Sequence, residues 1–516
     1  MLLPPASQRG SIPSLMCIST TLTRVLGALF SPLVLAIAVV LVPTLATAGA
    51  NSGTTEANQQ ASPLPSLRAD EERGKRAVEA TVQEKPALVI LSGATVLTAA
   101  GASYSPGYIV LENGRIKALG EGAPPAIEGA HLIDTSGMFI TPGIIDTHSH
   151  LGVYASPSSQ AHGDGNEASA PTTPGVWAEH SFGPQDPGLQ RAIAGGVTTI
   201  QVLPGSANLI GGRGVILQMT PHRGSRAMRF PGAPETLKMA CGENPKRVYG
   251  GRGGAPSTRM GNLRATRSAF LAAERHLKKL SEHESKQSPP DAKRRKKPKK
   301  KQQEDTESGP DRDLDLESLV GVLRGEILPQ VHCYRADDML SMLQLADEFG
   351  FSIRSFHHAT DAYKIRDILA RKKVAASIWA DWWGFKLEAY DAIPESAAML
   401  AQAGGTPVIH SDSSIGIQRL NQEAAKAWYS GLHAGIELDR NEALRWITWN
   451  PAWALGIQDQ TGSLEVGKRA DVVVWDGDPF SIYTSARWVF VGGVLRYDST
   501  DSRGWSDFEL GQRGER

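Results

Sequence analysis

The chain has 516 residues, 41% of them hydrophobic and 21% charged, and its 54 Lys and Arg residues balance 54 Asp and Glu residues. This length exceeds what one compact core accommodates, so we expect at least two structural units. A net charge of zero gives the chain no global attraction to nucleic acid or acidic membranes, and no nucleic-acid partner is expected.

Residues 1–48 predict a secretory signal peptide. Arg9 and Arg24 precede an apolar stretch at about residues 25–45, and Ala46-Thr47-Ala48 offers the small residues that a signal peptidase needs. We therefore expect export, to the periplasm or out of the cell, with no stable membrane insertion after cleavage. The alternative is an uncleaved membrane anchor, because the apolar stretch is nearly long enough to span a bilayer.

Cysteine usage argues against a disulfide framework. Of the three cysteines, Cys17 lies in the signal peptide, so only Cys241 and Cys333 remain in the exported chain. Two cysteines cannot build such a framework, although the compartment implied by export is oxidising.

The ordered chain begins and ends with β-type sequence. Residues 49–85 are poor in apolar side chains and predict a flexible linker. Short β-type runs separated by turns then fill residues 86–141 and again 456–500, before a tail at 501–516. The Asn113-Gly114 pair between two such runs predicts a hairpin. Because similar segments flank a different middle, we expect them to form one small sheet domain.

The middle segment, residues 142–455, alternates strand and helix patterns. The expected strands lie at 197–202, 327–332, 352–356, 374–378 and 406–409, and the expected helices at 336–349, 362–370, 395–403 and 421–433. Repeated strand–helix units predict a parallel sheet, and a closed eight-stranded barrel fits this span.

Residues 282–317 interrupt this alternation. A run of Lys and Arg at 293–301 is followed by an acid-rich stretch, and such a sequence cannot bury a core. We expect a disordered surface insertion. The alternative, a site for polyanions, predicts salt-sensitive binding that is independent of metal.

Histidine and aspartate residues stand where the predicted strands end. His148 and His150 follow an apolar run and share one face of a strand, and neutral imidazole is a good ligand for zinc. The other residues at strand ends are His332, His357, His358 and Asp412. In a strand–helix barrel these ends converge on one face, where active sites are built.

With these residues in place, the sequence resembles the amidohydrolase superfamily, in particular its imidazolonepropionase-like branch. The matching motifs are Phe139 to His150, Ala194 to Thr199, Thr448 to Ala452 and Gly462 to Val474. The resemblance covers about residues 87–497. It implies a (β/α)8 barrel of the TIM type that carries metal, with a small β-sandwich domain formed from both chain ends.

The resemblance also implies roles. His148 and His150 correspond to ligands of a first divalent metal, and His332 and His358 to ligands of a second, with zinc the expected ion. Asp412 corresponds to a ligand and general acid/base. His358 is preferred to His357 because it directly precedes Ala-Thr, and strand alternation allows only one of the two to face the pocket.

A bridging carboxylate is implied as well. Related enzymes often use a carbamylated lysine on the fourth strand, and Lys238 fits that place. The alternatives are a carboxylate from Glu243 or a site with a single metal ion.

Substrate contacts are expected from two loops. A Gly-rich loop at 205–213 ends in Arg213, which could pair with a substrate carboxylate. Trp382, Trp383 and Lys386 follow the predicted strand at 374–378 and could form a pocket wall.

The expected function is hydrolysis of a carbon–nitrogen bond in an amide, a cyclic amide or a small peptide. Metal-activated hydroxide would attack, and Asp412 would pass the proton to the leaving nitrogen, with His358 beside it. The alternatives are a ring deaminase of the same superfamily and a catalytically inactive binding scaffold. Homo-oligomerisation is left open by the sequence.

Overall fold

The computed structural model describes residues 88–156, 158–287, 311–382 and 384–501. These residues belong to the second of two units, Glu72–Arg516. The predicted signal peptide, the whole linker at 49–85, the basic run at 293–301, Trp383 and residues 502–516 lie outside the described residues. Within those described residues, no helix combines the length and apolarity that a membrane crossing requires.

An eight-stranded, nearly closed sheet forms the centre of the middle segment, with strands in chain order around it. Its strands are β6 (Ile144–Ser149), β7 (Val197–Val202), β8 (Ile210–Gln218), β9 (Glu235–Ala240), β10 (Ile327–His332), β11 (Ser355–His357), β12 (Ala375–Ile378) and β13 (Thr406–Ile409). All their residues are buried except at a few positions of β8, β9, β10 and β13. This burial on both faces explains their near-continuous apolar sequences.

One strand departs from the regular barrel that the sequence predicts. β8 pairs antiparallel with both β7 and β9, whereas the other neighbours in this sheet pair in parallel. The expected loop at 205–213 is therefore wrong in its second half, because β8 begins at Ile210. Its glycines hid the strand pattern: the chain passes so closely at Gly212 that a Cβ there would lie 2.5 Å from Val176.

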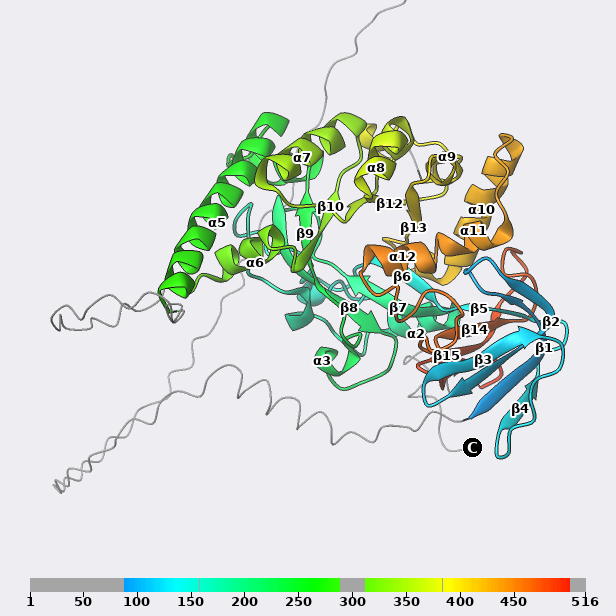
Figure 1. Ribbon diagram of the computed structural model, residues 1–516. Coiled ribbons are helices and arrows are strands. Elements are labelled where there is room, and N and C mark those ends of the chain that lie inside the picture. The colour runs from blue at the N-terminus through cyan, green and yellow to red at the C-terminus, as the bar shows by residue number, and fades with distance from the viewer. Residues whose placement is uncertain (1–87, 157, 288–310, 383, 502–516) are drawn as a thin grey trace, which may run out of the picture. The chain divides into compact units, whose positions relative to one another are not determined.

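Helices cover the outside of this sheet, as Figure 1 shows for α7 and α8 beside β10 and β12. The predicted helix at 336–349 is confirmed as α7, and that at 421–433 extends by one residue as α10. The helices are α2 (Pro187–Ala194), α3 (Ser225–Met228), α4 (Glu243–Gly250), α5 (Arg259–Gln287), α6 (Leu314–Leu323), α7 (Ala336–Phe349), α8 (Arg366–Lys372), α9 (Ser396–Gln402), α10 (Leu420–His433), α11 (Arg440–Arg445) and α12 (Trp449–Ala454).

The expected disordered insertion at 282–317 is wrong at both of its ends. Residues 282–287 form the last turns of α5, and residues 314–317 form the first turn of α6. The Asp313 side chain caps α6 by accepting from the amides of Asp315 and Leu316, 3.0 Å each. The acidic residues there therefore begin a helix, where negative charge favours the amino terminus.

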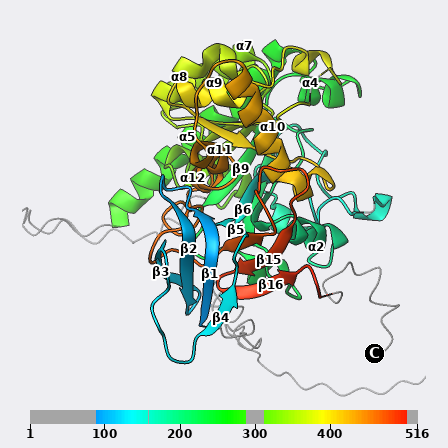
Figure 2. The ribbon, with the colours of Figure 1, turned by 90° about the vertical axis from the view of Figure 1, so that its right-hand side faces the viewer.

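A second eight-stranded sheet combines both chain ends. Its strands are β1 (Val89–Leu97), β2 (Ser103–Glu112), β3 (Arg115–Glu121), β4 (His131–Asp134), β5 (Phe139–Pro142), β14 (Val472–Trp475), β15 (Ala486–Val491) and β16 (Val494–Asp498). β5 joins the two halves, pairing with β1 and β14, and Figure 2 shows N-terminal β1 and C-terminal β15 in the same part of the molecule. The hairpin at Asn113-Gly114 is confirmed. A sandwich of two packed sheets is not confirmed, because these strands form one sheet.

The two sheets meet at the Pro142-Gly143 step, where β5 gives way to β6. A Cβ on Gly143 would lie 2.1 Å from the Thr198 hydroxyl, so the close approach of the chain to β7 requires glycine. The Gly143 amide donates to the Asp471 carbonyl, 2.9 Å, and the Asp471 side chain accepts from the Gly492 amide and the Thr461 hydroxyl, 2.8 Å each. The C-terminal motif thus fastens the chain at the start of β6.

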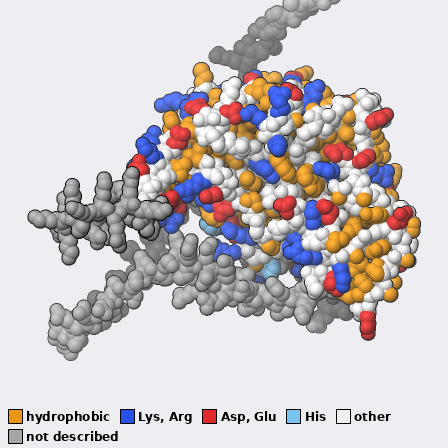
Figure 3. Space-filling view, in the orientation of Figure 1, with side chains coloured by type: hydrophobic (Ala, Val, Ile, Leu, Met, Phe, Trp, Pro, Cys, Tyr) orange, Lys and Arg blue, Asp and Glu red, His pale blue; other side chains and the backbone are white. Residues whose placement is uncertain are grey.

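Lys, Arg, Asp and Glu side chains are interspersed over the face drawn in Figure 3, so no broad field of one sign covers it. This distribution matches the balanced charge of the sequence.

A disulfide joins Cys241 to Cys333, across 92 residues of chain. Cys241 follows β9 and Cys333 follows β10, so the bond ties the ends of two neighbouring strands. The sequence correctly excluded a framework of several disulfides, but this single disulfide was not predicted. Cysteines 92 residues apart give no sequence signal of contact, which only the pairing of β9 with β10 creates.

The double variant Cys241→Ala/Cys333→Ala is expected to lose about 2–4 kcal/mol of unfolding free energy, because the bond restricts a long loop in the unfolded chain. Urea unfolding followed by circular dichroism measures the loss. Native protein unfolded in the presence of a reductant serves as the matched comparison and should shift in the same direction. An unchanged midpoint in both would show that the bond does not contribute to stability.

Candidate metal centre

Six histidine rings gather at the carboxyl ends of the barrel strands. His148 ends β6 and is followed by His150, while His332 ends β10. His148 lies at the centre of the cluster, with ring centroids 4.4 to 5.5 Å from those of the histidines at its sides, namely His150, His357, His358 and His410. His332 lies 4.8 Å from His358 by the same measure. Five of the rings are buried and His150 is partly exposed.

Two residues in this cluster adopt a left-handed backbone, His358 at φ 57° and Asp412 at φ 45°. His358 directly follows β11, and Asp412 follows β13 after His410 and Ser411. The rings of His357 and His358 both contact that of His148, and the preference for His358 as the ligand stays a prediction. Strand alternation ends at His357, and the left-handed turn brings the next ring to the same cluster.

The first chain of hydrogen bonds fixes the tautomer of His148. Gln330 donates its amide to the Ala454 carbonyl, 3.1 Å, which leaves its Oε1 to accept from His357 Nε2 at 2.8 Å. His357 Nδ1 then accepts from His148 Nδ1 at 2.9 Å. His148 Nε2 consequently carries a lone pair rather than a proton, and Lys238 Nζ lies 3.3 Å from it.

A second series of hydrogen bonds fixes the tautomer of His358. The Ile378 carbonyl accepts from His410 Nδ1 at 3.0 Å, so His410 Nε2 accepts from His358 Nδ1 at 2.8 Å. A single hydrogen bond fixes the tautomer of His150: its Nδ1 donates to the Leu203 carbonyl at 2.8 Å, so its Nε2 carries the lone pair. Such donors to a carbonyl or a neighbouring side chain orient metal-bound histidines.

The three Nε2 atoms converge on the Asp412 carboxylate. Its Oδ1 lies 3.3 Å from His150 Nε2 and 3.9 Å from His148 Nε2, and its Oδ2 lies 3.6 Å from His358 Nε2. One ligand atom from each of His148, His150 and Asp412 lies within 4.8 Å of the others. Imidazole lone pairs around a carboxylate form a donor set suited to zinc and similar divalent ions.

His332 gives a further test of whether this centre fits a metal. Both nitrogens of its buried ring lack a hydrogen-bond partner. Burial lowers its pKa well below the ordinary value, with the nearby Lys386 acting in the same direction, so the ring is neutral. A buried imidazole with no partner is costly, and a metal ion would satisfy it. The donor set therefore fits the implied divalent metal.

Burial also sets the charge of the other groups. It lowers the pKa of His150 and of His410 to about 3 and keeps both rings neutral. Burial raises the pKa of Asp412 to about 7, an effect that Lys238 opposes. These shifts describe the protein without metal, and a bound cation would reverse the trend at Asp412.

Lys238 is fully buried on β9, in register with Gln330. Its Nζ donates to the Pro204 carbonyl at 3.1 Å and lies 3.3 Å from His148 Nε2. Burial lowers the Lys238 pKa to about 7, against the attraction of Asp412. Glu243, the alternative source of a bridging carboxylate, begins α4 and faces Lys386 at 3.6 Å.

The predicted substrate residues lie in different places. Lys386 Nζ stands 3.7 Å from the Tyr334 ring centroid and 3.5 Å from Glu388, beside the cluster. Arg213 on β8 pairs with Glu235 and donates to Ser318 at 2.9 Å, so its guanidinium is engaged within the fold. The structure does not bring Arg213 to the histidines, and the substrate roles of these residues stay predictions.

A pocket of about 490 Å³ opens at Asp412. Its other described lining residues are Tyr334, Trp379, Asp381, Trp382 and Phe385. Trp382 therefore lines the pocket, as the sequence predicted, whereas Trp383 lies outside the described residues.

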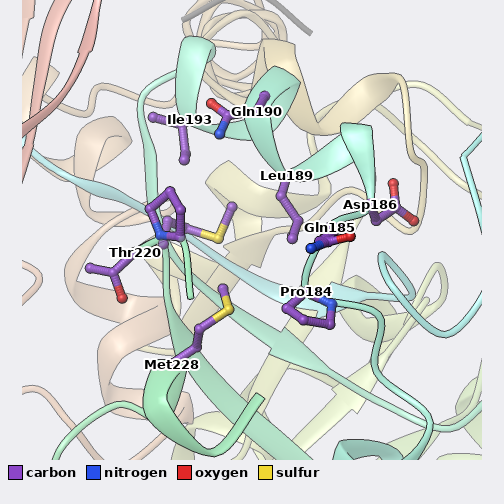
Figure 4. Close-up of a pocket in the computed structure, with 10 residues that line it drawn as sticks. Pro184, Gln185, Asp186, Leu189, Gln190, Ile193, Thr220 and Met228 are labelled. Carbon is purple, nitrogen blue, oxygen red and sulfur yellow. The ribbon is translucent and has the colours of Figure 1, made fainter. Parts of the chain in front are cut away.

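Two other cavities are not at this cluster. The one in Figure 4 lies between the first turns of α2 and the segment after β8, with a volume of about 30 Å³. That volume is large enough for water molecules and too small for a substrate. A larger cavity of about 650 Å³ is lined by Trp177, His180 and loop residues after β6.

Four functional residues were missed by the sequence analysis: Gln330, His410, Asp146 and Tyr334. The Asp146 carboxylate accepts from the amides of His148 and Ser411, 3.1 Å each, and from the Ser411 hydroxyl. The Asp412 amide donates to the His148 carbonyl at 3.0 Å. These contacts close the gap between β6 and β13. His410 stood in the sequence beside Asp412, but its role depends on a ring-to-ring contact that no spacing predicts.

Replacing Gln330 by methionine is expected to weaken divalent metal binding about 10- to 100-fold, because His357 loses the acceptor that orients it toward His148. Zinc affinity is measured by competition with a chelating dye. The matched control is Gln201→Met, a buried barrel glutamine that donates to Thr236 at 2.8 Å. Equal zinc affinity in both variants would contradict the orienting role of Gln330.

Comparison with known proteins adds independent information. The family model for the amidohydrolase family matches residues 391–497. The crystal structure of an amidohydrolase from Thermotoga maritima MSB8 is 34% identical in sequence, with a TM-score of 0.70, and the match covers 80% of this chain and 100% of that one. Amidohydrolase tasK of Hapsidospora irregularis is 35% identical over 412 residues, covering 76% of this chain and 40% of the relative, so the chain spans less than half of that protein. An imidazolonepropionase of Shewanella baltica (strain OS185) is 47% identical over 59 residues, 11% of this chain and 13% of the relative.

Proposed function

Because the chain belongs to the amidohydrolase superfamily, we propose that it is a divalent metal-dependent hydrolase of a carbon–nitrogen bond in an amide, a cyclic amide or a small peptide. The superfamily resemblance of the sequence is thereby confirmed. The observation that carries the proposal is the convergence of three imidazole lone pairs on Asp412.

The metal ligands in this proposal are His148, His150, His332, His358 and Asp412, and zinc is the proposed ion. A bound divalent ion would supply a water ionised near neutral pH and would polarise the substrate carbonyl. The role of the protein is to hold neutral ligands in fixed orientations and to keep the strand ends together. The orphaned ring of His332 supports its assignment.

Asp412 is the proposed general acid/base. Its carboxylate stands between the Nε2 atoms of His150 and His358 and also lines the pocket. From that place it can take a proton from the attacking water and deliver it to the leaving nitrogen. His358 contributes as a ligand and neighbour of this carboxylate.

The variant Asp412→Asn is expected to lose at least about 10³-fold in kcat, because the amide cannot accept the proton. Asparagine tolerates the left-handed backbone of this position, so the fold is retained. Turnover is measured on a panel of dipeptides and cyclic amides, and bound metal by elemental analysis. An Asp412→Asn variant with metal bound and native kcat would contradict the assignment.

Lys238 is the proposed bridge between two metal ions, as a carbamate. A neutral amine is the form that reacts with carbon dioxide, and both the burial of Lys238 and its contact with His148 Nε2 support this role. Glu243 remains the alternative, and its contact with Lys386 argues against it.

Lys238→Ala is expected to bind about one metal ion less per chain than the native protein, because the bridging carboxylate is removed. Elemental analysis after growth with bicarbonate and zinc measures the ratio. The control Lys386→Ala removes a neighbouring amine that touches none of the proposed ligands and should keep the native ratio. Native loading of the Lys238→Ala protein would refute the bridge.

Export remains part of the proposal. The Cys241–Cys333 disulfide supports it, since such bonds persist in oxidising compartments.

A further inference from the structure

An aromatic wall forms one side of the pocket at Asp412. Trp379 stacks on Trp382 with centroids 5.5 Å apart, and the Phe385 ring meets Trp379 edge-on at 5.7 Å. Tyr334 completes the set, 6.0 Å from Trp379 and 6.3 Å from Phe385. Tyr334 follows β10, and Trp379, Trp382 and Phe385 follow β12, so two separate segments of the chain build one apolar surface.

This wall continues into the proposed metal centre. The His358 imidazole contacts two of its rings, with its centroid 4.6 Å from that of Trp379 and 5.5 Å from that of Tyr334. Trp379 is fixed by its own indole, which donates to the Ser411 carbonyl at 3.1 Å, next to Asp412. A group held against the wall is therefore adjacent to the reacting end of the pocket.

The outer rings are unusually accessible. The exposed fractions are 41% for Trp382 and 56% for Phe385, although both rings contact Trp379. Large exposed apolar side chains around a pocket mouth are typical of a ligand-binding surface, because a bound ligand removes them from water.

The charges at this pocket do not favour a cation as its occupant. Asp381 and Asp412 are the carboxylates among the described lining residues. Asp381 is already paired with Lys426 at 2.7 Å, and Asp412 faces the histidines. Lys386 over the Tyr334 ring also places a positive charge beside the wall.

We propose that Trp382, Phe385, Tyr334 and Trp379 form a specificity subsite for an aromatic substituent on the substrate, next to the carbon–nitrogen bond that is cleaved. This inference rests on the proposed function, because it takes Asp412 as the reacting end. Offset stacking on Trp382 and edge contacts with Phe385 give an aromatic ring more than its buried area alone.

The test compares three ligands that differ only in side chain, namely N-acetyl-L-phenylalanine, N-acetylglycine and N-acetyl-L-lysine. Their affinity for the full-length, zinc-loaded protein is measured by isothermal titration calorimetry. The phenylalanine ligand is expected to bind at least about 10-fold more tightly than the glycine ligand, which is the scale for burying a large apolar side chain.

Three variants separate the subsite from general effects. Trp382→Ala is expected to remove most of the 10-fold preference, and Trp382→Phe to retain most of it. Tyr483→Ala is the matched control, because this exposed aromatic residue between β14 and β15 lies outside the pocket and should keep the preference. Zinc content is determined for each protein to show that the centre is intact.

Equal affinity for the three ligands, tightest binding of the lysine ligand, or no binding of the phenylalanine ligand would overturn the subsite. Turnover plays no part in this measurement. A protein that prefers the phenylalanine ligand but hydrolyses no amide would therefore contradict the proposed function and leave the subsite standing.

Discussion

Removal of the histidine cluster from water is the constraint on which the rest of this structure depends. A buried imidazole stays neutral, and each of its two nitrogens needs a partner inside the protein. Gln330 and the Ile378 carbonyl meet this need at the outer end of each hydrogen-bonded chain. Since each chain starts from a fixed acceptor, the direction of every donor follows. The Nε2 lone pairs of His148 and His358 are therefore left at the inner ends of these series, around Asp412, because the outer nitrogens are already hydrogen-bonded.

The remaining architecture holds these chains in register. Pairing of β9, β10 and β11 places Lys238 level with Gln330, and His332 level with His357. The Asp146 carboxylate, which accepts from Ser411, joins the first strand of the barrel to the last. Burial raises the pKa of Asp146 to about 6, and its hydrogen bonds with Ser411 oppose that shift. The antiparallel β8 shows that the barrel tolerates a changed strand direction even beside Lys238, whose partner on β8 is Gly212.

Sequence patterns predicted what depends on local periodicity. The helices α7 and α10, the strands β7 and β10 and the hairpin at Asn113 all follow from spacing and turn residues. Strand β8 was not predicted, because its glycines lack the side chains that carry a strand signal. The last turns of α5 and the first turn of α6 were not predicted, because their charged residues resemble disordered sequence. The positions of His332, His358 and Asp412 at one barrel end could be predicted, because strand ends converge. The partners of His148 and His358 could not, because they depend on which way each ring turns.

The left-handed backbone at two adjacent points of the cluster has unequal consequences for the two residues that carry it. Aspartate is among the few residues that accept this conformation readily, so at position 412 the demands of backbone and chemistry coincide. Histidine also occurs in this conformation more often than most residues, but glycine adopts it with less strain, and at position 358 the ring is positioned against Asp412. At position 358 the requirements of stability and activity therefore differ. A glycine or asparagine there would lower the backbone strain but would remove the imidazole.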